Sequence, residues 1–178
     1  MVKKNILITG VAGFIGSNIA NYLKKNKQLK IIGVDNLSTG FRKNIPRGIK
    51  FIKADLSDSK INKKLNFKCD YIFHFAGQSS AEKSFENPLL DIKNNTLSTI
   101  NLIEFSIKKK VKKIILASSM SVYGDNKTGF FSEKDKSRIA SSALFPTIAL
   151  NIGDNFLVLD LIFLLTTLTI LRFLLFFL

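Results

Sequence analysis

The chain has 178 residues, which is enough for one domain with a buried core and short for two. Hydrophobic residues make up 46% and charged residues 22% of it, a composition that excludes intrinsic disorder and indicates a globular protein. Cys69 is the single cysteine, which excludes an internal disulfide and favours a reducing compartment. We therefore expect a cytoplasmic location.

The formal net charge of +14 suggests a nucleic-acid partner. The lysines, however, are spread over most of the chain before residue 137, and only residues 108–113 form a dense cluster. That cluster falls between a predicted helix and a predicted strand, where a solvated loop explains it, and no aromatic side chains interleave with it for base stacking. We therefore expect no nucleic-acid partner.

Short apolar runs predict strands over residues 4–9, 31–35, 48–53, 70–75 and 113–118. Helical spacing of apolar residues predicts a helix over residues 15–26. A second, long helix begins near Pro88, and we expect one face of it to carry Leu89, Ile92, Thr96, Ile100, Ile103 and Ile107. Strands that alternate with helices predict an α/β fold, a Rossmann-like doubly wound parallel sheet with its ligand at the carboxyl ends of the strands.

A glycine-rich turn joins the first strand to the first helix. Gly10, Gly13 and Gly16 let the backbone turn sharply and approach a pyrophosphate closely, and the helix that follows offers unpaired N–H groups to the phosphates. A glycine triplet alone is a weak signal, but the strand–turn–helix context predicts a dinucleotide-binding turn.

Asp35 closes the second strand, at the position where a carboxylate accepts both hydroxyls of an adenosine ribose. The same carboxylate repels a 2′-phosphate, so the sequence favours NAD over NADP as the cofactor. Arg42 lies close enough in sequence to leave NADP open, and a plain strand-end carboxylate in a turn is the structural alternative.

The composition changes abruptly after Lys136, the last lysine of the chain. We therefore divide the chain into a domain of residues 1–136 and an apolar tail of residues 137–178. Three explanations of the tail stay open: a transmembrane anchor, ordinary buried elements whose partners are missing, and out-of-frame translation. Asp160 and Arg172 interrupt the apolar run and argue against the anchor.

Six motifs in chain order resemble those of the extended short-chain dehydrogenase/reductase family, the NAD-dependent epimerases and dehydratases of the UDP-glucose 4-epimerase type. They lie at residues 10–16, 35–40, 54–56, 74–78, 94–96 and 118–124. The resemblance implies NAD as cofactor, and a UDP-sugar or related nucleotide sugar as the substrate of intact relatives. It also implies that a homodimer can form. We expect no metal site, because His74 is the only histidine and has no cysteine or carboxylate cluster beside it.

The same resemblance assigns the site residues. It implies that Ser119 is catalytic, through a hydrogen bond to the sugar hydroxyl that is oxidised. It implies that the cofactor is bound by Gly10, Gly13, Phe14, Ile15, Gly16, Asp35, Asn36, Ser38, Gly40, Asp55, Leu56, Phe75, Ala76, Gly77, Gln78, Asn95 and Ser118.

The family's catalytic base does not have a counterpart in this chain. The family uses a tyrosine whose pKa is lowered by a lysine four residues later, and alignment puts Ile148 and Ile152 at these two positions. Neither side chain can transfer a proton. We therefore expect an NAD-binding fragment without turnover that lacks the C-terminal substrate domain. The alternative is a membrane-tethered, non-catalytic NAD-binding module.

Overall fold

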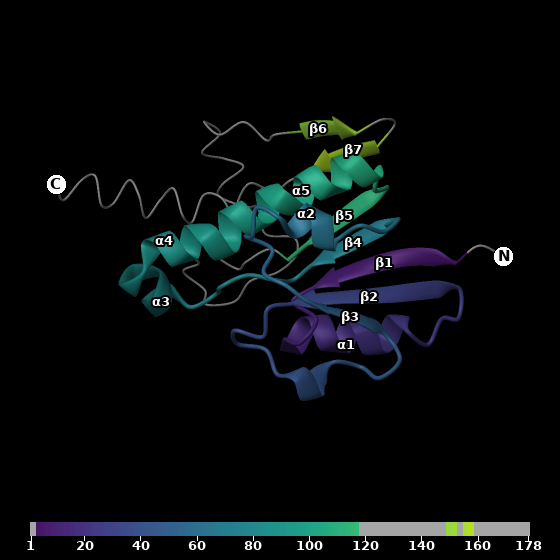
Figure 1. Cartoon of the computed structure of the whole chain (residues 1–178), viewed down its shortest axis with the longest axis horizontal. Coiled ribbons are helices and arrows are strands. Elements are labelled where there is room, and N and C mark those ends of the chain that lie inside the picture. Colours follow the sequence, from purple (N-terminus) through teal and green to yellow (C-terminus); the bar gives the residue numbers. More distant parts are fainter. Residues whose placement is uncertain (1–2, 118–148, 153–154, 159–178) are drawn as a thin grey trace, which may run out of the picture.

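The computed structural model of the chain describes residues 3–117 and two short strands at residues 149–152 and 155–158 (Figure 1). A parallel five-stranded sheet has the strand order β3-β2-β1-β4-β5. Its members are β1 (Lys4–Thr9), β2 (Leu29–Asp35), β3 (Lys50–Lys53), β4 (Tyr71–His74) and β5 (Lys113–Leu116). The predicted Rossmann-like parallel sheet is therefore confirmed, with strand ends within a few residues of those expected.

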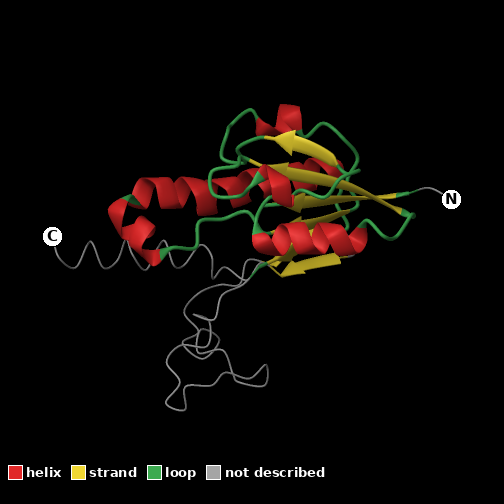
Figure 2. Cartoon of the chain, turned by 90° about the horizontal axis from the view of Figure 1, so that it is seen from below, coloured by secondary structure: helices red, strands yellow, loops and turns green. Residues whose placement is uncertain are grey.

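Helices cover both faces of this sheet. The helix α1 (Phe14–Leu23) lies on one face, whereas α2 (Ile61–Lys64) and α5 (Ser98–Lys109) lie on the other (Figure 1, Figure 2). The shorter helices are η1 (Arg42–Asn44), α3 (Ala81–Glu86), α4 (Pro88–Asp91) and the π-helical segment η2 (Ile92–Leu97).

Two apolar layers hold the helices on the sheet. On the α5 face, Leu7, Ile72 and Leu102 are almost fully buried, and the ring of Phe105 packs on that of Phe67 with 5.6 Å between centroids. Burial of each such side chain contributes about 1.5–3 kcal/mol. On the α1 face the sheet is less well covered at β5, where Ile115 remains exposed.

The first helix is shorter than predicted, because it ends at Leu23 instead of Asn26. Its buried residues are the small Gly16, Ser17 and Ala20, whereas Ile15 and Tyr22 are exposed. Small side chains let the start of the helix lie close to the glycine turn. The helix is therefore fixed less by a large apolar stripe than by close backbone packing.

The long predicted helix exists, but its apolar face is not the buried one. The segment is divided into α4, η2 and α5, and Leu89, Ile100 and Ile107 of the expected face are 79%, 42% and 50% exposed. The side that faces the sheet carries instead Asp91, Asn95, Thr99, Leu102 and Phe105. Polar residues occupy part of this buried side because they bond to the end of β4, a role that apolar periodicity cannot indicate.

Two strands follow outside the main sheet. β6 (Ala149–Ile152) pairs antiparallel with β7 (Asn155–Val158). Ile152, predicted to stand at the position of the family's lysine, is thus the last residue of a strand. Ile148 and most of the tail lie outside the described residues, so the three explanations of residues 137–178 remain predictions. Among the described residues, no helix is both long and apolar enough to span a membrane.

Candidate functional site

The strand order reverses direction between β1 and β4, which are adjacent in the sheet although they are separated in sequence. Open α/β sheets bind their ligands at such a switch point, outside the carboxyl ends of the strands. Thr9, the last residue of β1, is paired in register with His74, the last residue of β4. The loops that follow these two strands therefore define the candidate site.

The glycine turn lies on the β1 side of this point. Gly10 has φ +67°, and a Cβ there would come within 2.7 Å of the Phe75 and Ala76 backbone. A Cβ on Gly16 would lie 2.2 Å from the Gly10 carbonyl oxygen, whereas one on Gly13 would meet nothing closer than 3.3 Å. Gly10 and Gly16 are thus required by the protein's own packing. The absence of a side chain at Gly13 is not required by this packing and instead leaves space at the surface of the turn.

The start of α1 is available to an anion. Gly13 caps this helix and has no side chain that could accept its first-turn N–H groups. Phe14 and Ile15 begin the helix, and both side chains are exposed. Free N–H groups and the positive end of the helix dipole together favour a phosphate here.

Asp35 joins the glycine turn to the loop after β2. One carboxylate oxygen accepts a hydrogen bond from the Ala12 N–H at 2.9 Å, and the other accepts from the Leu37 N–H at 2.7 Å. Leu37 has φ +62°, so the chain bends sharply after the strand. Asp35 is buried, and its carboxylate is held at the edge of the sheet by two backbone donors.

The loop after Asp35 packs against the glycine turn. A Cβ on Gly40 would lie 2.8 Å from the Ala12 Cβ, so this glycine permits close contact between the two loops. Asn36 accepts a hydrogen bond from the Ser38 N–H at 3.0 Å, and Ser38 is exposed. The Arg42 guanidinium lies over the Phe51 ring, 5.5 Å from its centroid. Arg42 is thus engaged with β3, a position that weakens the argument for NADP.

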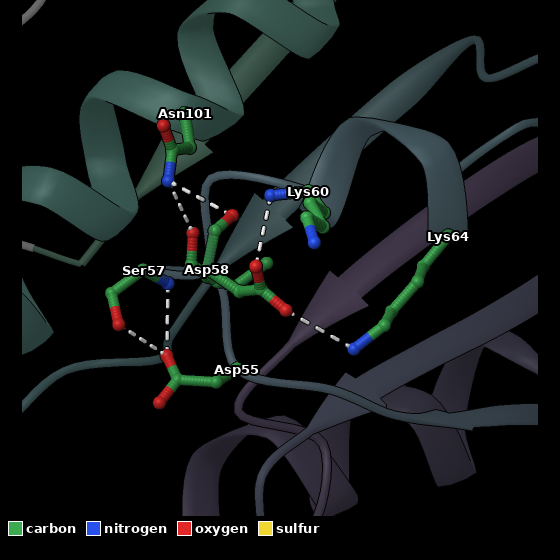
Figure 3. A network of polar contacts seen from close by, with 7 residues as sticks. Asp55, Ser57, Asp58, Lys60, Lys64 and Asn101 are labelled. Atoms are coloured by element: carbon green, nitrogen blue, oxygen red, sulfur yellow. Dashed lines mark hydrogen bonds and ion pairs between the residues drawn. The ribbon is translucent and has the colours of Figure 1, made fainter.

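Asp55 follows β3 at the same edge of the sheet. Its Oδ1 accepts hydrogen bonds from the Ser57 N–H at 2.8 Å and the Ser57 hydroxyl at 2.6 Å (Figure 3). Partial burial raises the pKa of Asp55, but the Ser57 hydrogen bonds and the Lys93 charge outweigh it, and the net pKa lies below the usual value. Asp55 therefore carries a negative charge at neutral pH.

Asn101 of α5 fixes this segment from the other side. Its amide donates to the Leu56 carbonyl at 2.8 Å and reaches the Asp58 carbonyl at 3.5 Å (Figure 3). The Leu56 side chain is buried in the core, so only its backbone can meet a ligand. Asp58 is in turn bonded by the Lys60 N–H and by the Lys64 ammonium, both at the surface (Figure 3).

The segment that follows β4, from Phe75 to Gln78, is held by Asn95 of η2. The Asn95 side chain accepts from the Gln78 N–H at 2.7 Å and donates to the Gln78 carbonyl at 2.9 Å. The Gln78 side chain is bonded to Ser84 and Asp91. Because Asn95 is buried, it can act on a ligand only through the Gln78 backbone.

The structure thus brings the described site residues to one edge of the sheet. These are Gly10, Gly13, Phe14, Ile15, Gly16, Asp35, Asn36, Ser38, Gly40, Asp55, Leu56, Phe75, Ala76, Gly77, Gln78 and Asn95. Ser118 and Ser119 lie outside the described residues, so their predicted roles are untested. No cluster of three metal-ligating side chains occurs in the part of the chain that the structure describes.

The sequence did not indicate two residues that shape this edge. Asp91 is buried, and its Oδ1 accepts from Ser84 at 2.8 Å and from Asn95 at 3.0 Å, which fixes the start of the long helix to the β4 loop. Asn101 reads as an ordinary surface position of a helix. For Asp91, the only available signal was its position on the side of the helix opposite to the apolar stripe.

Comparison with known proteins agrees with this geometry. The model of the NAD dependent epimerase/dehydratase family matches residues 6–144. An uncharacterized protein of Methanocaldococcus jannaschii is 38% identical over 149 residues, which cover 76% of this chain and 46% of that protein.

Solved structures show the same likeness. The UDP-glucose 4-epimerase of Thermus thermophilus in complex with NAD matches with a TM-score of 0.67 and 36% identity, over 78% of this chain and 47% of that chain. The UDP-glucose 4-epimerase of Thermotoga maritima with UDP-glucose matches with a TM-score of 0.65 and 38% identity, over 68% of this chain and 40% of that chain. The chain thus spans less than half the length of these relatives.

Proposed function

Because the chain belongs to the NAD dependent epimerase/dehydratase family, we propose that its residues 1–136 bind NAD and that it does not turn over a nucleotide sugar. The observation that carries this proposal is the Asp35 carboxylate, held between the Ala12 N–H of the glycine turn and the Leu37 N–H of the next loop. A carboxylate fixed there accepts ribose hydroxyls and repels a 2′-phosphate.

The proposed cofactor contacts fall into four groups. The glycine turn supplies N–H groups to the pyrophosphate, the Asp35 loop binds the adenosine ribose, and the Asp55 segment lies against the adenine. The segment after β4, from Phe75 to Gln78, lies beside the nicotinamide riboside, with Ser118 completing this side. When it is bound, NAD supplies a hydride acceptor.

The proposed lack of turnover rests on the catalytic pair. Ile148 and Ile152 stand where the family has a tyrosine and a lysine, and an aliphatic side chain cannot take the proton of a sugar hydroxyl. Ser119 by itself could donate or accept a hydrogen bond, but it could not take the place of the family's tyrosine as the catalytic base. Intact relatives would act on a UDP-sugar or related nucleotide sugar, while this chain would retain the cofactor half of the site.

We also propose that the chain forms a homodimer through the long helix. Leu89, Ile100 and Ile107 lie on one side of the α4–η2–α5 segment and are exposed. An exposed apolar stripe of this kind is typical of a protein–protein contact. Sedimentation would give twice the 19.9 kDa chain mass for the unaltered protein and one chain mass for Ile100→Glu. One chain mass for both would contradict the dimer.

The experiment for the main proposal pairs binding with turnover. Purified full chain is titrated against NADH, whose fluorescence reports binding, and is then incubated with NAD and UDP-galactose while UDP-glucose is measured. We expect saturable binding and no product above the blank. Formation of product would contradict the assignment of Ile148 and Ile152, and a lack of binding at millimolar cofactor would remove the proposal.

A further inference from the structure

His74 joins three elements at the switch point of the sheet. It ends β4 opposite Thr9 of β1 and is buried. Its Nδ1 lies 2.6 Å from the Thr9 hydroxyl, and its Nε2 lies 3.1 Å from the hydroxyl of Thr99 on α5. One imidazole therefore links β1, β4 and α5 at the point where a ligand is expected.

The hydrogen bonds around this ring have one consistent direction. The Thr99 hydroxyl donates its only proton to the Asn95 carbonyl at 2.6 Å, so it must accept from His74 Nε2–H. His74 Nδ1 then carries a lone pair and accepts from the Thr9 hydroxyl. Burial lowers the pKa of His74 to about 4, which agrees with a neutral ring at neutral pH. His74 is thus held as the Nε2–H tautomer.

The chain of bonds ends on the backbone that follows β4. Because Thr9 donates to His74, its oxygen is left to accept from the Phe75 and Ala76 N–H groups, both at 3.2 Å. The same backbone segment lies against Gly10, where a Cβ would approach it to 2.7 Å. The Phe75 N–H is also bonded to the Thr9 backbone carbonyl at 3.2 Å, whereas the Ala76 N–H is bonded to the Thr9 hydroxyl. The orientation of the Phe75–Ala76 peptide therefore depends on this hydroxyl through the Ala76 N–H, and the hydroxyl depends on His74.

We propose that His74, fixed by Thr99, is a positioning residue that orients the Phe75–Ala76 peptide toward the nicotinamide half of the cofactor. The role rests on the proposed binding of NAD. His74 itself does not touch the ligand, because its ring is buried and both nitrogens are already bonded. Its loss should therefore weaken binding of the nicotinamide half selectively and leave the adenosine half, held by Asp35, unchanged.

The binding test uses Thr99→Val, which keeps the side-chain shape and removes the acceptor for His74 Nε2–H. We expect the affinity for NAD to fall about tenfold or more, and that for ADP, which lacks the nicotinamide riboside, to change less than twofold. Thr99→Ser should restore NAD binding. Ser106→Ala removes another buried hydroxyl of α5, one that donates to the Ile103 carbonyl of the same helix at 2.7 Å, and should leave both affinities unchanged.

Equal losses of NAD and ADP affinity, or none, would overturn the positioning role while leaving NAD binding by the unaltered chain intact. No NAD binding by the unaltered chain would instead refute the proposed function, and this role with it.

A spectroscopic test does not depend on the variants folding. His74 is the only histidine of the chain, so ¹⁵N labelling of histidine gives one pair of ring nitrogen signals. In the unaltered protein we expect a protonated Nε2 and an unprotonated Nδ1 that do not change between pH 6 and 8. NAD, but not ADP, should shift the Nδ1 signal. A protonated Nδ1, a mixture of tautomers, or equal responses to both ligands would overturn the proposal.

Discussion

Gly13 caps α1 and Gly16 lies three residues later within that helix, yet the structure predicts opposite effects when each is replaced by alanine. In Gly16→Ala the new Cβ would lie 2.2 Å from the Gly10 carbonyl oxygen and 3.0 Å from the Val11 Cα. Both neighbours are backbone atoms, so α1 must move away from the turn. Forcing extra volume into such a contact costs about 1–3 kcal/mol. A loss near 2 kcal/mol lowers the melting temperature of a chain of this size by roughly 4–8 °C.

Gly13→Ala is the matched substitution. Its Cβ would lie 3.3 Å from the Gly10 oxygen, which small adjustments can relieve. The variant should melt close to the unaltered protein, because alanine also restricts the unfolded chain by about 0.4–1 kcal/mol. Its methyl group would instead occupy the space at the surface of the turn, and NAD affinity should fall at least tenfold. Calorimetric melting and NAD titration of both variants test this contrast. Unchanged melting of Gly16→Ala, or unchanged NAD binding by Gly13→Ala, would refute the reasoning.

Three further predictions concern titration, charge and reactivity. Asp35→Asn leaves one buried N–H poorly bonded, so the free energy of unfolding, measured by urea titration, should fall by about 1–3 kcal/mol. The preference for NAD over NADP should also decrease, because the negative charge is lost. An unchanged preference would contradict the role of this charge. Burial lowers the pKa of His74 from 6.5 to about 4, so the unfolded chain binds more protons between these values. The free energy of unfolding should therefore rise by about 1.4 kcal/mol per pH unit from pH 4 to 6.5 and gain nothing more from His74 above pH 6.5. His74→Gln should lack this rise, and identical pH profiles of the two proteins would exclude the contribution of His74. Burial raises the pKa of Cys69 to about 12, so a thiol reagent at pH 8 should modify the native chain slowly and the urea-unfolded chain fully. Rapid modification in native buffer would mean that the β4 side of the core is open.

The sheet could be predicted from the sequence because its strands coincide with short apolar runs, and the first two runs end at residues with a distinct backbone or chemical property. Gly10 and Asp35 are such residues, and local patterns locate both within a few positions. The buried face of the long helix could not be predicted in this way. Its apolar stripe through Leu89 and Ile100 faces outward, while Asp91 faces inward to bond with the β4 loop.

Polar contacts between residues far apart in the chain also could not be predicted from the sequence. Thr9 and His74 are 65 residues apart, and His74 and Thr99 are 25 residues apart. Each is an ordinary residue in its local context, and only the parallel register of β1 and β4 brings the first two together. Local spacing carries no information on such a register, so a histidine that looks merely structural in the sequence acquires a proposed role at the site.

Whether residues 1–136 form an NAD site is tested directly by a calorimetric titration of the unaltered full chain with NAD. We expect saturable heat with one NAD per chain, and much weaker binding of NADP under the same conditions. The sample should first be shown to be folded, by the slow reaction of Cys69 with a thiol reagent. A titration of such a sample that gives no heat up to millimolar NAD would contradict an NAD site in residues 1–136.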